Sequence, residues 1–294
     1  MKEKLTIDSD LVGVPWKQVN KTITWRQTTN YAAAINDMNP LYVDDINNEL
    51  IAPPMFAVTM GWPLAKNIRQ YIDVPYSQEV LERDVHYTEY IEFHKPIKPG
   101  ADGINVVIQP RIHAMISQRA GTNVVYKYEV MDETGDLYYT EYNGTMLRGV
   151  ECIDGGKGEL PVVPKTESDE IIWEVPVYVK PELPYIYDGC TDIVFAIHTS
   201  PKYAHSVNLP SNLLQGTATI ALAVREVINR ELDGNAAKVK ALNAKLTAMV
   251  FPGTTICIQF LERRVGDNLV ELFFRVLNEE GKIALANGYI KAEK

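Results

Sequence analysis

The sequence predicts an α+β protein that carries the same fold twice, each copy built from one long helix and several antiparallel strands. Three observations support this prediction. Similar segments recur in the two halves at a nearly constant spacing, each half contains one helical run of apolar residues, and several segments alternate β-branched or aromatic residues with polar ones. With 294 residues, 46% of them hydrophobic, the chain can bury a sizeable core.

The recurring segments follow the same order in both halves. Two matched pairs are 156 residues apart (198 − 42 and 210 − 54), and two further pairs have slightly smaller separations that short deletions explain. The matched residues are Tyr42 with His198, Pro54 with Pro210, Gly100 with Gly253, and Gly135 with Gly281. An ordered series of this kind indicates a tandem duplication.

The elements of the first half begin with the turn segment NDMNPLYVDD (36–45). A helical pattern follows over 56–72, although an internal glycine and proline make it less regular. Segments 124–130 and 137–148 are rich in β-branched and aromatic residues with stretches of period two, which predicts antiparallel strands.

The second half repeats this order. Its helical run, LLQGTATIALAVREVINREL (213–232), is apolar over a broad face and charged only near its end, as expected of a helix that a sheet buries. TICIQFLERR (255–264) and LVELFFRVL (269–277) predict strands, and each half contains a glycine-bearing acidic turn between two strands.

A connector separates the halves. The stretch 150–170 is rich in glycine, proline and charged residues, which is typical of an exposed linker. We therefore expect a first unit at 1–150, a linker at 151–170 and a second unit at 171–294.

The composition disfavours several classes of function. A net charge of −9 and a pI of about 5.2 argue against nucleic acid and anionic membranes as partners. The first ten residues lack the apolar core of a secretory signal, and no apolar stretch approaches the roughly 18 residues that a membrane helix needs. We therefore expect a cytoplasmic protein.

Cysteine and histidine spacing gives no sign of a metal site. Cys152, Cys190 and Cys257 are odd in number and scattered, which predicts reduced, structural thiols. The five histidines show no ligand spacing, so no metal is predicted. We expect a structural role for the histidines that fall in or beside strand patterns, which are His86, His94 and His113.

Several segments are similar to those of one known family. YAAAINDMNPLYVDD, APPMF and EFHKPIKPGADG lie in the first half, and IHTSPKYAHSVNLPSNLLQGTATIALA lies in the second. Together they resemble the MaoC-like (R)-specific enoyl-CoA hydratases and dehydratases, in the form that fuses two hotdog units. The resemblance covers nearly the whole chain. It implies a double hotdog fold, with each helix wrapped by a curved antiparallel sheet, and a coenzyme A thioester as substrate without a bound cofactor.

The family's hydratase motif implies roles for residues of the second half. His198 falls at the catalytic histidine, an acid and base, and Gly216 at the helix start would donate its backbone N–H to the thioester oxygen. Gln215 either orients the ligand or satisfies a loop carbonyl. Thr199 and Ser200 either bind water or ligand, or cap the short helix predicted in SPKYAHSV.

The chain departs from the family motif at its aspartate. The family's Asp lies five residues before the histidine, at Ile193 here, and its Asn lies three before, at Phe195. Neither side chain can transfer a proton. Asp192 is one residue away and can assist only if the loop is shifted, and otherwise it is an exposed loop carboxylate.

The turn of the first half fits the motif except at the histidine. Asp37, Asn39 and Pro40 match, but Tyr42 stands at the histidine position, as is usual in the family's N-terminal unit. The resemblance therefore implies a non-catalytic unit that shapes the acyl pocket, with Asp37 and Tyr42 as candidate substrate-binding residues. Asp37 also suits a purely local turn, and we do not expect it to meet His198.

Three functions remain open from the sequence. The first is a hydro-lyase that hydrates an enoyl-CoA or dehydrates the 3-hydroxyacyl-CoA, the second is a thioesterase on the same fold, and the third is a non-catalytic acyl-CoA-binding or supporting subunit. A homodimer is possible. Coenzyme A phosphates need local cations, for which the candidates are Lys202, Arg263 and Arg264.

Overall fold

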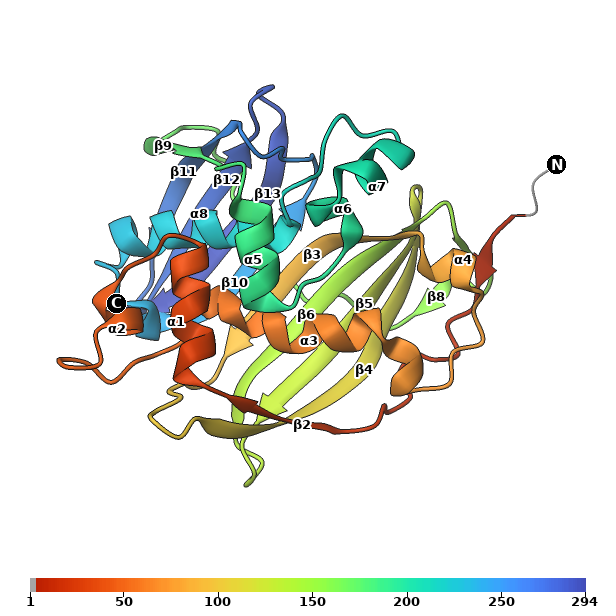
Figure 1. The fold of residues 1–294 in the computed structure, drawn as a ribbon, viewed down its shortest axis with the longest axis horizontal. Coiled ribbons are helices and arrows are strands. Elements are labelled where there is room, and N and C mark those ends of the chain that lie inside the picture. Colours follow the sequence, from red (N-terminus) through yellow and green to blue (C-terminus); the bar gives the residue numbers. More distant parts are fainter. Residues whose placement is uncertain (1–3) are drawn as a thin grey trace.

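A single large antiparallel sheet organises the structure. The computed structural model describes residues 4–294 and places eleven strands in one sheet, in the order β2-β4-β5-β6-β3-β10-β13-β12-β11-β9, with the short β8 beside β4. The long helices lie together on one face of this curved sheet (Figure 1). The main strands of the first half are β2 (Val19–Ile23), β3 (Asp84–Phe93), β4 (Ile104–Gln118), β5 (Gly121–Met131) and β6 (Leu137–Arg148). Those of the second half are β9 (Trp173–Tyr178), β10 (Val239–Leu246), β11 (Thr255–Val265), β12 (Leu269–Leu277) and β13 (Ile283–Glu293).

The sheet order is symmetric about the pairing of β3 with β10. Reading outward from that pair, β6-β5-β4-β2 on one side corresponds to β13-β12-β11-β9 on the other. In the central pair, Ile91 lies opposite Leu242 and Glu89 lies opposite Ala244. The predicted duplication and the double hotdog fold are thereby confirmed.

The central helix of the second unit, α8 (Gly216–Glu231), is mostly buried against the sheet, as its apolar sequence predicts. Its counterpart is shorter than the predicted helix over 56–72. It consists of the 3₁₀ turn η1 (Pro54–Ala57), α3 (Val58–Lys66) and a second 3₁₀ turn, η2 (Ile68–Gln70). Pro63 inside α3 lacks the N–H for an intrahelical bond, which shortens the regular segment.

Two further helices were not predicted from the sequence. They are α1 (Trp25–Ala34) and α5 (Leu183–Thr191), which pack against each other at the junction of the units. The start of α1 carries a recognisable signal, because Thr24 and Gln27 form a capping box. Shorter helices complete the fold: α2 (Pro40–Val43), α4 (Gln78–Leu81), α6 (Ala196–Thr199), α7 (Pro201–Ser206) and η3 (Ala236–Lys238).

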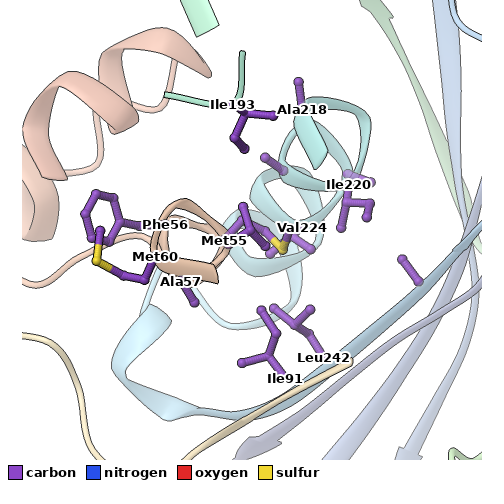
Figure 2. Close-up of a cluster of buried hydrophobic side chains, with 14 of the residues drawn as sticks. Met55, Phe56, Ala57, Met60, Ile91, Ile193, Ala218, Ile220, Val224 and Leu242 are labelled. Carbon is purple, nitrogen blue, oxygen red and sulfur yellow. The ribbon is translucent and has the colours of Figure 1, made fainter. Parts of the chain in front are cut away.

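The hydrophobic core is continuous between the units. Figure 2 shows Met55 of η1 close to Val224 of α8, with Ile91 and Leu242 of the central strand pair beneath them. Side chains from both halves of the chain therefore fill one interior, and burial of this area stabilises the junction as well as each unit.

The connector begins later than the sequence indicates. Residues 151–157 pack onto the first unit, since β7 (Glu151–Cys152) pairs with β1 (Thr6–Ile7) and β8 (Gly156–Lys157) pairs with β4. The chain then runs without regular structure to β9. Within residues 4–294, none of the helices combines the length and the apolar character that a bilayer-crossing helix requires.

Candidate active site

A cavity of about 640 Å³ lies where the two units meet, at the start of α8. We call it the junction cavity. Both units line it: the first contributes Trp62, Lys66 and His86, and the second contributes His198, Gly216 and Leu246. A site of this size, enclosed mainly by apolar side chains with a few polar groups, suits a small-molecule ligand.

His198 is held in one orientation by the loop that precedes α8. Its Nδ1 lies 3.0 Å from the carbonyl oxygen of Leu213, and the Asn212 amide donates to the carbonyl oxygen of His198 at 2.7 Å. Because a carbonyl only accepts, Nδ1 carries the hydrogen, which leaves the lone pair on Nε2. Burial lowers the pKa of His198 to about 4, so the ring is neutral at pH 7 and can act as a base.

Gly216 is the first residue of α8. An N–H at this position has no partner within its own helix, and nothing among residues 4–294 accepts a hydrogen bond from it. The helix dipole adds a favourable potential for negative charge at this point. A Cβ at this residue would come 2.3 Å from Cδ1 of Leu246, so the absence of a side chain at Gly216 allows Leu246 to pack closely against the start of α8.

The side chain of Gln215 makes one hydrogen bond to a backbone carbonyl and keeps one free acceptor. Its Nε2 donates to the carbonyl oxygen of Pro184 at 2.9 Å, which joins α5 to the start of α8. Its Oε1 is buried without a partner among the described residues, and the side chain lines the junction cavity. The free oxygen can accept a hydrogen bond from a ligand.

The aspartate position of the family motif is apolar in the cavity wall. Ile193 and Phe195 both line the junction cavity, and Figure 2 places Ile193 in the buried cluster near Ala218 of α8. The Phe195 ring meets the His198 ring edge-on, with centroids 6.2 Å apart. No carboxylate therefore stands where the motif would put one.

Asp192 does not line the junction cavity. It ends α5 in the left-handed backbone region, with φ of 56°, and its side chain is exposed. Its charge acts on Lys21 of β2 instead. The loop shift that would bring Asp192 to His198 is absent from the described structure.

Thr199 and Ser200 also lie outside the lining of the junction cavity. Ser200 caps α7, since its Oγ accepts a hydrogen bond from the Tyr203 N–H at 3.2 Å. The capping alternative is thus confirmed for Ser200.

The turn of the first unit packs elsewhere, against the C-terminal half of α8. Asp37 and Tyr42 are buried, and neither lines the junction cavity. Burial raises the pKa of Asp37, and the charge of Arg225 on α8 partly opposes this. From the sequence we expected that Asp37 and His198 would not meet, and the structure keeps them apart.

The cations proposed for coenzyme A lie elsewhere. Arg263 pairs with Glu231 at 2.7 Å and Arg264 with Glu262 at 2.6 Å, and neither lines the junction cavity. Lys202 does not line the cavity either. The basic side chains that do line it are Lys66, Arg148 and Lys282.

Comparison with known proteins identifies both halves. Residues 10–140 match the FAS1-like, dehydratase domain region, and residues 169–271 match the MaoC like domain. The chain is 23% identical over 262 residues to the peroxisomal multifunctional enzyme type 2 of Drosophila melanogaster, covering 86% of this chain and 42% of that protein. It is 22% identical over 219 residues to the peroxisomal enoyl-CoA hydratase 2 of Arabidopsis thaliana, covering 70% of this chain and 67% of that protein.

Solved structures agree with the fold. The crystal structure of a MaoC-like dehydratase from Phytophthora capsici matches with a TM-score of 0.80 and 19% identity over 97% of both chains. The chain spans less than half of the Drosophila relative. With both halves matched in order and the two units arranged symmetrically, the chain belongs to the MaoC-like dehydratase family in its double hotdog form, with a FAS1-like dehydratase region as its first unit.

Proposed function

We propose that this protein catalyses the reversible, (R)-specific addition of water to an enoyl-CoA thioester. The observation that carries the proposal is the pairing of a neutral His198 with the free Gly216 N–H in one cavity. The Arabidopsis relative is named an enoyl-CoA hydratase, and family membership adds weight to the same chemistry.

The reaction needs a base for water and a donor for the thioester oxygen. In the proposed step, Nε2 of His198 takes a proton from water while the water oxygen bonds to C3 of the substrate. The π electrons of the C2=C3 bond move towards the thioester, whose oxygen accepts a hydrogen bond from the Gly216 N–H. The imidazolium of His198 then returns its proton to C2, which completes the addition of one water.

The location of His198 and Gly216 also suggests how the substrate lies. With the thioester oxygen at Gly216, the acyl chain points into the junction cavity and the coenzyme A moiety lies towards its rim. Lys66 and Arg148 are the basic residues available there for phosphate groups, whereas Lys282 already pairs with Glu280.

The test is the hydration of crotonyl-CoA, followed as loss of the conjugated thioester absorbance, with chiral analysis of the product. Wild type should form the (R)-alcohol, and His198→Gln should lose about 100-fold or more in kcat. His205→Gln is the matched control, because His205 lies on α7 near the site but is exposed. A wild type that binds enoyl-CoAs of several lengths and converts none would favour the binding role, and release of free coenzyme A would favour the thioesterase.

A further inference from the structure

A second imidazole lines the junction cavity, and it comes from the first unit. His86 lies on β3 with its side chain only 8% exposed, and its ring meets that of Trp62 at a centroid distance of 6.4 Å. The sequence suggested a structural role for this histidine. The structure places it instead in the wall of the cavity that holds His198 and Gly216.

The hydrogen-bond partners of His86 indicate which of its two ring nitrogens carries the hydrogen. Its Nε2 lies 3.2 Å from the carbonyl oxygen of Thr88 and 3.1 Å from Oε2 of Glu89. The Asn143 amide nitrogen also lies 3.2 Å from Nε2, and it donates to that same Glu89 oxygen at 3.0 Å. Two acceptors and one donor therefore surround Nε2. Because the Asn143 amide makes its shorter contact as a donor to Glu89, we assign the hydrogen to Nε2, where it faces the two acceptors, and the lone pair to Nδ1. No group among residues 4–294 forms a hydrogen bond to Nδ1.

Glu89 contacts the Nε2 side of the His86 ring. Glu89 is fully buried on the helix-facing side of the sheet, and Glu141 is buried on the neighbouring strand. Burial raises the pKa of Glu89, so its carboxyl is neutral, and its Oε2, which accepts from Asn143, faces the His86 ring as an acceptor. The arrangement therefore presents Nδ1 as a fixed hydrogen-bond acceptor.

The sheet register places His86 beside the start of α8. Thr88 lies opposite Lys245 in the β3–β10 pair. His86 therefore lies near the end of β10, where Leu246 contacts the position of Gly216. The first unit thus contributes an imidazole to the cavity that His198 and Gly216 also line.

We propose that His86 is a second catalytic residue, whose Nδ1 binds the attacking water together with Nε2 of His198. The inference rests on the proposed hydration. Water donates one hydrogen to each ring, so its oxygen lone pair is directed at C3. His198 takes the proton and returns it to C2, while His86 gains and loses none. His86 thereby supplies the second contact to water that a carboxylate at Ile193 would otherwise supply.

Two variants at this position separate the roles of its two nitrogens. His86→Gln can keep the donor towards Thr88 but lacks an acceptor at Nδ1, whereas His86→Asn can place an oxygen close to Nδ1. His94→Gln is the control, because His94 follows the same strand and borders a different pocket. Each variant is measured for kcat and KM with crotonyl-CoA, for the Kd of unreactive butyryl-CoA, and for thermal unfolding.

We expect His86→Gln to lower kcat about 100-fold with KM and Kd within about threefold of wild type, and His86→Asn to keep more of the kcat. His94→Gln should match wild type. A rise in KM with unchanged kcat would overturn the proposal and make His86 an acyl-chain contact, and unchanged kinetics would overturn it outright. A wild type that is itself inactive would instead refute the proposed hydration.

Discussion

Tyr31 and Tyr187 meet across the two units, with their hydroxyl oxygens 3.2 Å apart and their positions 156 residues apart in the chain. This is the separation of the sequence repeat, so the two tyrosines are equivalent residues of α1 and α5. Both are fully buried and their rings pack edge to face. Burial raises the pKa of both phenols, so one neutral hydroxyl donates to the other.

The two single Tyr-to-Phe replacements should have non-additive effects on the free energy of unfolding. Tyr31→Phe leaves the Tyr187 hydroxyl without this partner, which should lower the free energy of unfolding by about 1–3 kcal/mol. The double variant, with Tyr187→Phe added, should lose less than the sum of the single losses. Urea unfolding measures all three, with the exposed Tyr178→Phe as control. Strictly additive losses would show that the two hydroxyls do not interact.

His198 should make stability depend on pH. Burial lowers its pKa in the folded protein to about 4, below the ordinary 6.5. Between these values the unfolded chain binds a proton that the folded chain does not, so stability falls as the pH is lowered. The loss from this residue between pH 7 and pH 5 should be about 2 kcal/mol.

The check is urea unfolding of wild type, His198→Gln and His205→Gln at both pH values. His198→Gln should show a smaller loss than wild type, whereas the exposed His205→Gln should behave like wild type. An equal pH dependence in all three proteins would mean that His198 is solvated in the folded state.

The sequence was informative where one local pattern determines the element. Strands β6 and β12 begin and end at the predicted residues, and α8 falls within the predicted helix. Helices α1 and α5 escaped prediction because their apolar faces are short and their stability comes from packing against each other.

Only the part of the candidate site that the second unit contributes was predicted from the sequence. His198 and Gly216 follow from a local motif, but the role of His86 depends on the pairing of β3 with β10, which joins distant parts of the chain. Similarly, the spacing of the family motif could place Ile193 at the aspartate position, while only the structure shows that Asp192 lies outside the cavity lining. Spacing alone does not reveal such tertiary relationships.

A methyl group at Gly216 should affect activity more than stability. In Gly216→Ala the new Cβ requires the end of Leu246 to move, and this flexible side chain can turn into the cavity. The free energy of unfolding should change by less than about 1 kcal/mol, because alanine also favours the helix. Displacement of the substrate should lower kcat/KM for crotonyl-CoA about 10- to 100-fold.

Leu246→Ala is the control for this effect. The double variant Gly216→Ala/Leu246→Ala should approach the kcat/KM of Leu246→Ala alone, since the crowded side chain is then absent. Failure of the double variant to recover would place the defect in the helix start itself and not in the contact with Leu246.

Ile193→Asp should reintroduce the missing carboxylate at a cost in stability. Ile193 is 1% exposed, so an ionised side chain there should lower the free energy of unfolding by about 2–4 kcal/mol at pH 7. Burial raises the pKa of such a carboxyl, so the folded protein takes up a proton on acidification before the unfolded chain does. Ile193→Asn cannot ionise. The difference in the free energy of unfolding between Ile193→Asp and Ile193→Asn should therefore be smaller at pH 5 than at pH 7.

The same substitution should change the pH dependence of activity. The introduced carboxylate and His198 would titrate as a pair, and while the carboxylate is ionised it favours the imidazolium form, so the pair takes up its first proton at a higher pH than His198 alone, whose pKa is about 4. The acidic limb of kcat/KM, which reports the free enzyme's base, should therefore move to higher pH in Ile193→Asp and stay in place in Ile193→Asn. An acidic limb that does not move in Ile193→Asp would show that the side chain at 193 does not face the imidazole of His198.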